Sequence, residues 1–514
     1  MGKTVIHHPH LTTMTETIAF HSERHPDHTA VLTSSGQRST YRDLHQASDA
    51  VAAGLAALGV TAGDRVAYLG REGPAYWEVL FAAARTGAVL VPVNWKLTAT
   101  EVGHILADCD ARVVFLDGDH PLRGTTSRHE VVTDGDYPRW RDTPRPPAPR
   151  HEATPQTPLA QLYTSGTTGL PKGVVLPHHS FFAIRDALAA AELDWIDWRD
   201  GDVALIGIPG FHIGGLWYAT QAFHAGATVY SMPTFDPATV RRAVSQDGVT
   251  VAIFVPAMMR SILASGADAA EFAGLRKVVY GGAPISEALL EESARVFDCD
   301  FAQIYGLTET GNTAICLPPE QHVPGSVRLR AAGRPYPGVQ VRIVEDGAEV
   351  PQGGTGEVHL RTPAAMLEYW NLPEATAATL VDGWVRTGDA GYLDDEGYLY
   401  IQDRVKDMIL VGGENVFPAE IENALAAHPA IADVAVVGIP DDHTGEAVLA
   451  HVVFRPDQQA STRQLMLFLR GRIADFKLPS RYQVLDAVPR NPSGKILRRE
   501  LREPHWRGHQ RRVN

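Results

Sequence analysis

Short apolar runs that alternate with helical segments constrain the fold of this chain more than any other feature of its sequence. The runs are bounded by turn residues and read RVAYLG (65–70), RVVFL (112–116), VALIGIP (203–209) and VAIFVP (251–256). The segment SDAVAAGLAALGV (48–60) has the apolar spacing of a helix. Because buried strands that alternate with helices usually pair in parallel, the pattern predicts largely parallel sheets covered by helices on both faces, a layered α/β fold.

Two breaks in this pattern divide the chain. The proline-rich segment 142–158 is expected to be an extended connector. Near Asp403 a hairpin-like run changes into a glycine-containing strand pair, and a helical pattern runs from 461 to its break at Pro479. Since 514 residues exceed what one core supports, we expect a large multi-subdomain N-terminal domain, 1–402, and a small α+β C-terminal domain, 403–514.

The charge balance and the lack of long apolar runs exclude several classes of protein. Sixty Asp and Glu residues against 46 Lys and Arg give a net charge of −14, which argues against a nucleic-acid-binding surface. The arginine-rich stretch 498–512 is interpreted as a solvated final helix and tail. No apolar run approaches the roughly 18 residues of a membrane span. The N-terminus lacks a secretory signal, and the three cysteines lack metal-ligand spacing, so we expect a cytoplasmic protein, monomeric or homodimeric.

The segment YTSGTTGLPKG (163–173) concentrates hydroxyl side chains, glycines and a lysine in one loop. Glycine exposes backbone amides, which together with hydroxyls and an ammonium group make a donor surface for phosphate oxygens. The loop is not a Walker A motif, because Pro171 precedes Lys172 and Gly173 follows it. Taken alone, such a loop is more often an ordinary mobile turn, so its interpretation depends on other motifs in the chain.

Six motifs in a fixed order carry a family resemblance that covers nearly the whole chain. They are YTSGTTGLPKGV, YGGAPI (280–285), QIYGLTE (303–309), WVRTGD (384–389), DRVKDMILVGGENVFPAEIE (403–422) and NPSGKILRREL (491–501). With them the chain resembles the acyl- and aryl-CoA synthetase branch of the adenylate-forming superfamily. The resemblance implies that a carboxylate attacks the α-phosphate of ATP, that pyrophosphate leaves, and that the thiol of coenzyme A then cleaves the acyl-adenylate. It also implies Mg²⁺ and a mobile C-terminal domain.

The resemblance assigns an ATP site residue by residue. Tyr305 would lie against adenine, with Gln303 near its exocyclic amine. Glu309, beside Thr308, would bind Mg²⁺ against the phosphates. The β- and γ-phosphates would be held by Thr164, Ser165, Gly166, Thr167, Thr168, Gly169 and Lys172, and the base pocket would be shaped by Gly282, Ala283, Pro284 and Gly306.

Further implied residues lie at the junction of the two domains. Asp389 would accept both ribose hydroxyls, and Arg404 would reinforce the ribose or phosphate. Lys495 would bridge the substrate carboxylate and the α-phosphate during adenylation. Lys406 would be the hinge for domain alternation. The glycines of VGGEN would then line a pantetheine tunnel, with a plain hairpin turn as the alternative; they are Gly412 and Gly413.

The resemblance also implies an acyl pocket. His212 would guard its carboxylate end, although a core histidine is the alternative. Ile304, which stands where many long-chain members carry glycine, predicts a narrow cavity for a compact aryl or short- to medium-chain acid. The walls would combine apolar side chains with glycines that make space, namely Ile213, Gly214, Tyr218, Val255, Met258, Tyr280, Gly281, Ile304, Gly306 and Gly311.

The leading hypothesis is therefore an ATP-dependent carboxylic acid:CoA ligase that uses a small-molecule acid, Mg²⁺ and coenzyme A. The VGGENVFPAEIE segment has the form found in CoA ligases. The alternative is a biosynthetic adenylating enzyme that transfers to a carrier-protein thiol, or that activates nitrite for diazotisation of an aryl amine. These alternatives share the whole ATP site.

Overall fold

The computed structural model describes residues 6–124, 126, 128–165, 171–404, 407–412, 414–441, 443–490 and 496–507. Its largest sheet has nine strands, and the strands from β13 to β1 pair in parallel, whereas the edge strands pair antiparallel. In spatial order this first sheet consists of β15 (Arg334–Pro335), β14 (Ile315–Leu317), β13 (Asp300–Tyr305), β12 (Lys277–Gly281), β11 (Val251–Phe254), β9 (Val203–Ile206), β10 (Thr228–Ser231), β1 (Thr29–Thr33) and β2 (Arg38–Thr40).

A second sheet of seven strands carries the predicted phosphate loop. Its strands are parallel apart from an antiparallel hairpin and one short edge strand. In spatial order they are β19 (Glu368–Tyr369), β8 (Pro171–Pro177), β7 (Pro158–Ser165), β4 (Val89–Pro92), β3 (Arg65–Leu69), β5 (Val113–Leu116) and β6 (His129–Val132). The hairpin is formed by β7 and β8.

Two further sheets follow in the chain. The third sheet is antiparallel and consists of β17 (Ala348–Glu349), β16 (Gln340–Glu345), β18 (Gly356–Arg361), β21 (Trp384–Leu393), β20 (Leu380–Val381) and β22 (Leu399–Arg404). The fourth sheet consists of β24 (Glu414–Val416), β23 (Ile409–Val411), β26 (Gly445–Phe454), β25 (Ile431–Asp441) and β27 (Arg481–Val484), of which only β27 pairs in parallel.

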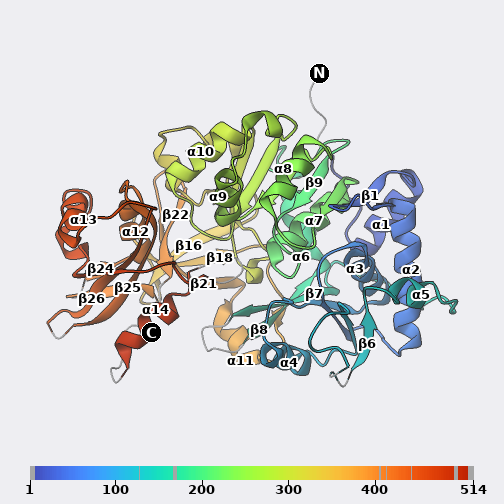
Figure 1. Cartoon of the computed structure of the whole chain (residues 1–514). Helices are drawn as coiled ribbons and strands as arrows, with labels where there is room; N and C mark the ends of the chain where they lie inside the picture. Colours follow the sequence, from blue (N-terminus) through green and yellow to red (C-terminus); the bar gives the residue numbers. More distant parts are fainter. Residues whose placement is uncertain are drawn as a thin grey trace.

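The helices complete a layered architecture (Figure 1). They are α1 (Met14–Arg24), α2 (Tyr41–Ala57), α3 (Pro74–Thr86), α4 (Ala99–Asp108), α5 (Tyr137–Asp142), α6 (His178–Ala190), α7 (Ile213–Ala225), α8 (Pro237–Ser245), α9 (Pro256–Ala264), α10 (Glu287–Phe297), α11 (Pro373–Thr379), α12 (Pro418–Ala426), α13 (Thr462–Leu469) and α14 (Arg498–Trp506). Short 3₁₀ turns are η1 (Ala269–Phe272), η2 (Thr308–Thr310), η3 (Pro319–Gln321), η4 (Val327–Arg330) and η6 (Asp475–Lys477).

The hydrophobic clusters show how the layers pack. One core joins side chains of α1, α2, α3, α6 and α7 to both the first and the second sheet, so these helices form a layer between the sheets. A second cluster packs α8, α9 and α10 on the other face of the first sheet, and α4 covers the other face of the second sheet. The order is therefore helix, sheet, helix, sheet, helix. The fourth sheet, with α12, α13 and α14, has clusters of its own and lies at the left of Figure 1.

The layered α/β prediction is confirmed, with two corrections. The four apolar runs form β3, β5, β9 and β11, all in parallel pairs. The alternation did not predict the antiparallel third sheet, whose strands β16, β18 and β21 are partly exposed. The helix predicted to run as far as Pro479 ends at Leu469, because Gly471 adopts a φ of 75° and the chain turns there.

The predicted domain boundary after residue 402 falls inside β22, whose last residue, Arg404, still lies opposite Asp389 of β21. The division into two domains stays a prediction. Among the described residues, no helix is long and apolar enough to cross a membrane.

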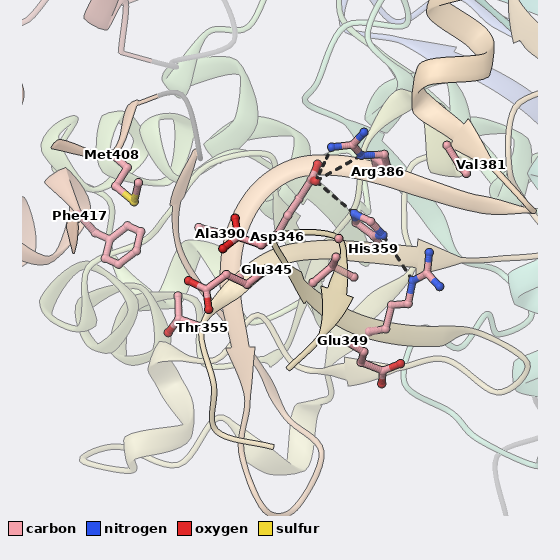
Figure 2. A pocket seen from close by; sticks show the side chains of 15 residues that line it. Glu345, Asp346, Glu349, Thr355, His359, Val381, Arg386, Ala390, Met408 and Phe417 are labelled. Carbon is pink, nitrogen blue, oxygen red and sulfur yellow. Dashed lines mark hydrogen bonds and ion pairs between the residues drawn. The ribbon is translucent and has the colours of Figure 1, made fainter. Parts of the chain in front are cut away.

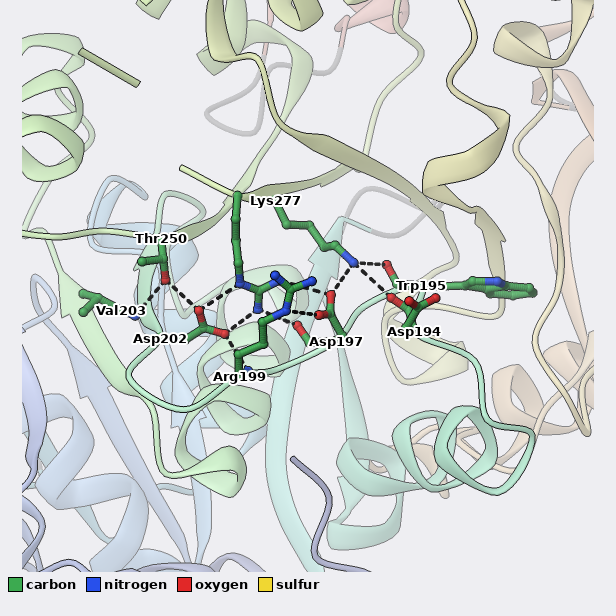
Figure 3. A network of polar contacts seen from close by, with 9 residues as sticks. Asp194, Trp195, Asp197, Arg199, Asp202, Val203, Thr250 and Lys277 are labelled. Carbon is green, nitrogen blue, oxygen red and sulfur yellow. Dashed lines mark hydrogen bonds and ion pairs between the residues drawn. The ribbon is translucent and has the colours of Figure 1, made fainter. Parts of the chain in front are cut away.

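A network of buried charges joins the amino-terminal ends of β9, β11 and β12 (Figure 3). Lys277 bonds to Asp197, and Arg276 donates to Asp197 at 3.1 Å and to Asp202 at 2.9 Å. Thr250 also donates to Asp202, at 2.8 Å. Burial raises the pKa of Asp197, but its interactions with Lys277, Arg276 and Arg199 together outweigh burial and hold that pKa below its usual value. These contacts fix the starts of three strands whose opposite ends carry predicted site residues.

Candidate active site

The β7–β8 hairpin holds both ends of the predicted phosphate loop. Thr164 lies opposite Lys172, and Ser165 lies opposite Pro171. The tip, 166–170, lies outside the described residues, and with it Gly166, Thr167, Thr168 and Gly169. The Lys172 ammonium nitrogen lies 4.8 Å from the centre of the Tyr369 ring on the neighbouring β19. The hairpin therefore presents a cation beside an aromatic face.

Glu309 lies in η2, a single 3₁₀ turn that follows the carboxyl end of β13 and begins at Thr308. Its Oε1 accepts a hydrogen bond from the Tyr369 hydroxyl at 2.7 Å, and its backbone carbonyl accepts one from Met366 at 2.9 Å. The run from Tyr305 to Glu309 is half-buried, in contrast to the buried residues that follow it. Glu309 and Lys172 thus share Tyr369 as a neighbour.

A second predicted pair links the first and third sheets. Tyr305, the last residue of β13, donates its hydroxyl hydrogen to Asp389 Oδ2 at 2.7 Å. Asp389 is buried on β21, and the strand register places it opposite Arg404. The structure therefore brings together three of the residues predicted for the nucleoside.

Gln303 has internal partners. Its Oε1 accepts a hydrogen bond from the Tyr280 hydroxyl at 3.0 Å, and its Nε2 donates to the Ala331 carbonyl at 3.3 Å. Tyr280 also lies 3.0 Å from His322 Nε2. The Gln303 carbonyl oxygen can accept a second hydrogen bond, and its contact with an adenine amine stays a prediction. The neighbouring base-pocket segment Gly282, Ala283 and Pro284 follows the carboxyl end of β12, with Gly282 at a φ of 79°.

His212 immediately precedes α7, with Ile213 and Gly214 in the first turn of that helix. Burial and, to a smaller extent, the charge of Lys96 lower the pKa of His212 to about 4. The imidazole is therefore neutral at pH 7. Its Nε2 is buried, and no described residue bonds to it. A neutral ring with an unsatisfied nitrogen suits a ligand oxygen.

At three of the predicted wall glycines, protein backbone occupies the space that a Cβ would take. A Cβ on Gly281 would lie 2.3 Å from the Ile304 carbonyl oxygen, and one on Gly306 would lie 2.4 Å from that of Asn312. At Gly311, with a φ of 70°, it would lie 2.4 Å from the Ala364 carbonyl oxygen. These glycines permit close packing of neighbouring segments. Their place in the wall of an acid pocket stays a prediction.

The other predicted wall residues lie on several elements. Val255 and Met258 lie at the start of α9, and a Cβ on Gly282 would be 3.5 Å from Val255. Ile304 is buried on β13. Tyr218 packs instead against Trp198, with 5.2 Å between the ring centres.

Three predicted residues of the C-terminal part lie outside the described residues: Lys406, Gly413 and Lys495. Gly412 lies in the turn between β23 and β24 with a φ of 60°, and among the described residues only Thr444 comes within 4.0 Å of the position a Cβ would take. The hairpin turn considered as the alternative is thus present. A role in binding coenzyme A stays a prediction.

Sequence reasoning missed two residues of this region, Tyr369 and Asn312. Tyr369 follows Glu309 by sixty positions, and no local pattern connects them. Asn312 adopts a φ of 92°, is 8% exposed, and carries a buried Nδ2 to which no described residue bonds. The sequence clue to Asn312 was its position directly after Gly311 in a turn, because asparagine tolerates the positive φ that a turn can require.

A cavity of about 570 Å³ lies elsewhere, between the third sheet and the first residues of the C-terminal part (Figure 2). Its lining includes Arg342, Glu357, His359, Arg386, Met408 and Phe417, and none of the residues predicted for ATP or the acid. Burial opposes ionisation of Glu357, but its bonds with His359 and Arg386, at 3.1 and 3.0 Å, keep its pKa below the usual value. The lining residue Arg386 lies on β21, the strand that also carries the buried Asp389.

Comparisons with known proteins agree with these motifs. The profile of the "AMP-binding enzyme" family matches residues 18–370, and that of the "AMP-binding enzyme C-terminal domain" matches residues 420–495. The fatty acid–[acyl-carrier-protein] ligase ScoC of Streptomyces coeruleorubidus is 56% identical over 99% of each chain. The indoleacetate–CoA ligase of Aromatoleum aromaticum is 38% identical over 95% of this chain and 98% of that protein.

Solved structures show the same similarity. The o-succinylbenzoate CoA synthetase of Bacillus subtilis, in complex with the acyl-adenylate OSB-AMP, matches with a TM-score of 0.84 and 30% identity over 94% of this chain and 97% of that one. The ATP-bound MatB of Rhodopseudomonas palustris matches with a TM-score of 0.88 and 28% identity over 96% and 100%. The chain belongs to the AMP-binding enzyme family and is an ATP-dependent, AMP-forming ligase of the acid–thiol type.

Proposed function

We propose that this enzyme activates a small carboxylic acid as its adenylate and transfers the acyl group to a phosphopantetheine thiol. The observation that carries the proposal is the meeting of three sheets at one place. Lys172 comes from the second sheet, Glu309 follows a strand of the first, and Asp389 belongs to the third. Tyr369 contacts both Lys172 and Glu309. Tyr305 donates a hydrogen bond to Asp389.

In the first step, a carboxylate oxygen attacks the α-phosphorus of ATP while the bond to pyrophosphate breaks. Lys172 and the hairpin bind the departing phosphates, and Asp389 accepts hydrogen bonds from the ribose hydroxyls. Tyr305 holds the Asp389 carboxylate in place through its hydroxyl. Lys495 neutralises charge between the acid and the α-phosphate. Positioning and charge neutralisation thus supply the catalysis.

The residues near Glu309 fit a magnesium ion. Mg²⁺ is usually bound through one or two carboxylates together with substrate phosphates. Glu309 Oε1 has a donor in Tyr369, and no described residue bonds to Oε2. When bound, the ion would neutralise phosphate charge.

In the second step, a thiolate sulfur attacks the carbonyl carbon of the acyl-adenylate, and AMP leaves with the bonding electron pair. His212, neutral and lacking a described partner at Nε2, donates one hydrogen bond to the acid in the first step. Lys406 serves as the hinge that moves the C-terminal part between the steps, and Gly412 and Gly413 border the thiol's path.

The identity of the thiol has two candidates that share the same pantetheine chemistry. The 56% identity to a fatty acid–[acyl-carrier-protein] ligase supports a carrier-protein thiol and a fatty acid. The indoleacetate–CoA ligase at 38% identity supports the alternative, coenzyme A with an aryl acid. Ile304, buried on β13, supports a compact acid in either case.

The test is acid-dependent exchange of labelled pyrophosphate into ATP, with fatty acids of increasing chain length and a set of aryl acids. Each active acid is then offered coenzyme A or a phosphopantetheinylated carrier protein, and thioester is detected by mass spectrometry. We expect exchange with short- to medium-chain acids and more rapid transfer to the carrier. AMP formation that depends on nitrite and on no carboxylic acid would overturn the proposal.

A further inference from the structure

Tyr369 lies between the two charged groups proposed to act on the phosphates of ATP. Its hydroxyl donates to Glu309 Oε1 at 2.7 Å, and the Lys172 ammonium lies 4.8 Å from the centre of its ring. A hydroxyl that donates to a carboxylate restricts its rotation, and a tyrosine ring attracts a cation over its face. One side chain therefore contacts both groups through two different parts of itself.

The backbone around Tyr369 is fixed to the hairpin that carries Lys172. Tyr369 belongs to β19, which pairs with β8, and the Trp370 amide donates to the Gly173 carbonyl at 2.7 Å. The Trp370 indole donates to the Asp108 carbonyl at 3.1 Å, and the Arg65 guanidinium lies 3.3 Å from the centre of the same ring. These contacts hold the strand, and hence the base of the Tyr369 side chain, in one position.

Glu309 depends on the same segment for its own placement. It lies in a three-residue 3₁₀ turn, which offers few backbone bonds to orient a side chain. The Met366 amide donates to the Glu309 carbonyl at 2.9 Å, three residues before Tyr369 reaches the carboxylate. The backbone and the side chain of Glu309 are therefore both held by residues 366–369.

We infer that Tyr369 is a positioning residue for acid activation. Its hydroxyl sets the orientation of the Glu309 carboxylate toward the metal, and its ring sets the position of Lys172 toward the phosphates. The inference rests on the proposed function, because that function gives Glu309 and Lys172 their roles. Tyr369 acts through these two residues and couples the metal to the phosphate-binding loop.

Two substitutions separate the hydroxyl from the ring. Tyr369→Phe removes the donor and keeps the aromatic face, so we expect the half-saturating Mg²⁺ concentration for pyrophosphate exchange to rise about 10-fold. Binding of metal-free ATP should not change in this variant. Tyr369→Leu removes both features and should in addition weaken metal-free ATP binding about 2- to 5-fold. Calorimetric titration of ATP with and without Mn²⁺ measures both effects independently of turnover.

A matched control is Tyr392→Phe, since the Tyr392 ring stacks on Tyr400 at 5.0 Å in the third sheet, away from Glu309. It should leave the metal dependence unchanged, and the thermal midpoints of the two phenylalanine variants should agree within about 2 °C. In a Glu309→Gln background, Tyr369→Phe should add no further loss of Mn²⁺–ATP affinity, because its route of action is already removed.

If the losses of Mn²⁺–ATP affinity caused by Tyr369→Phe and Glu309→Gln multiply in the double variant, the inference is overturned. A merely structural role of Tyr369 would act independently of Glu309 and would give that result. An unchanged metal requirement in Tyr369→Phe would also overturn it. If the parent enzyme exchanges pyrophosphate with no acid, the proposed function fails instead, and the Mn²⁺–ATP titration still tests the role of Tyr369.

Discussion

At the scale of single residues, two carboxylates of the described site are held by tyrosine hydroxyls before any ligand arrives. Asp389 is held by Tyr305, and Glu309 is held by Tyr369. The motifs allowed Asp389, Tyr305 and Glu309 to be predicted. Tyr369 could not be predicted in that way, because its contact joins segments sixty positions apart.

Replacing Asp389 by alanine tests the ribose assignment. A charge-assisted hydrogen bond contributes about 1.5–3 kcal/mol, so we expect the KM for ATP in acid-dependent exchange to rise about 10- to 100-fold. The KM for the acid should change little. Tyr305→Phe, which leaves the carboxylate in place, is the matched control and should raise the KM for ATP less than Asp389→Ala does. Equal effects on ATP and acid would contradict the assignment.

Gly311 tests whether the glycines near the site serve packing. Gly311→Ala places a Cβ 2.4 Å from the Ala364 carbonyl oxygen at a φ of 70°, and the left-handed backbone alone costs about 1–2 kcal/mol. Gly36→Ala is the matched control, because its φ is 86° and nothing lies within 4 Å. We expect a larger fall in the thermal midpoint for Gly311→Ala than for Gly36→Ala. Equal falls in the thermal midpoint would show that the left-handed backbone conformation, and not packing against Ala364, causes the loss of stability.

At the scale of elements, periodicity predicted the parallel strands because they are buried on both faces and read as continuous apolar runs. The third sheet was missed because its strands are partly exposed and do not read as continuous apolar runs. The end of α13 was missed because Gly471 lies inside an otherwise helical pattern. The meeting of three sheets at the site is set by tertiary packing, which no local pattern contains.

Lys277→Met tests the buried network at the starts of the strands. Removing one partner of a buried ion pair typically costs about 3–5 kcal/mol, although Arg276 and Arg199 still bond to Asp197 and reduce that loss. We expect a lower thermal midpoint with KM values for ATP and acid unchanged. A raised KM at unchanged stability would place the network in the catalytic machinery and contradict this interpretation.

At the scale of the whole molecule, several buried histidines make stability depend on pH. Burial lowers the pKa of His21 to about 4, partly offset by its bond to the His224 carbonyl, and lowers that of His178 to about 3. A folded-state pKa below the unfolded value near 6.5 favours the neutral ring in the folded state. Stability is therefore complete above about pH 6.5 and decreases as the pH falls toward 4.

The thermal midpoint should thus stay level between pH 8 and pH 7 and fall progressively from pH 6.5 to pH 4.5. One such histidine contributes up to about 3 kcal/mol of this loss. His21→Gln should make the fall of the thermal midpoint with decreasing pH less steep. His129→Gln, at an exposed position, should not change that fall. A midpoint that is independent of pH across this range would contradict the argument.

The two ends of the strands in the first sheet have different functions. Interlocked charges secure β9, β11 and β12 where they begin, and the segments that follow β12 and β13 carry the groups proposed to meet the nucleotide. Substitutions where these strands begin should therefore lower the amount of folded enzyme, while substitutions after β12 and β13 should alter how the enzyme binds its nucleotide. Nucleotide binding can consequently be changed without destabilising the strands of this sheet.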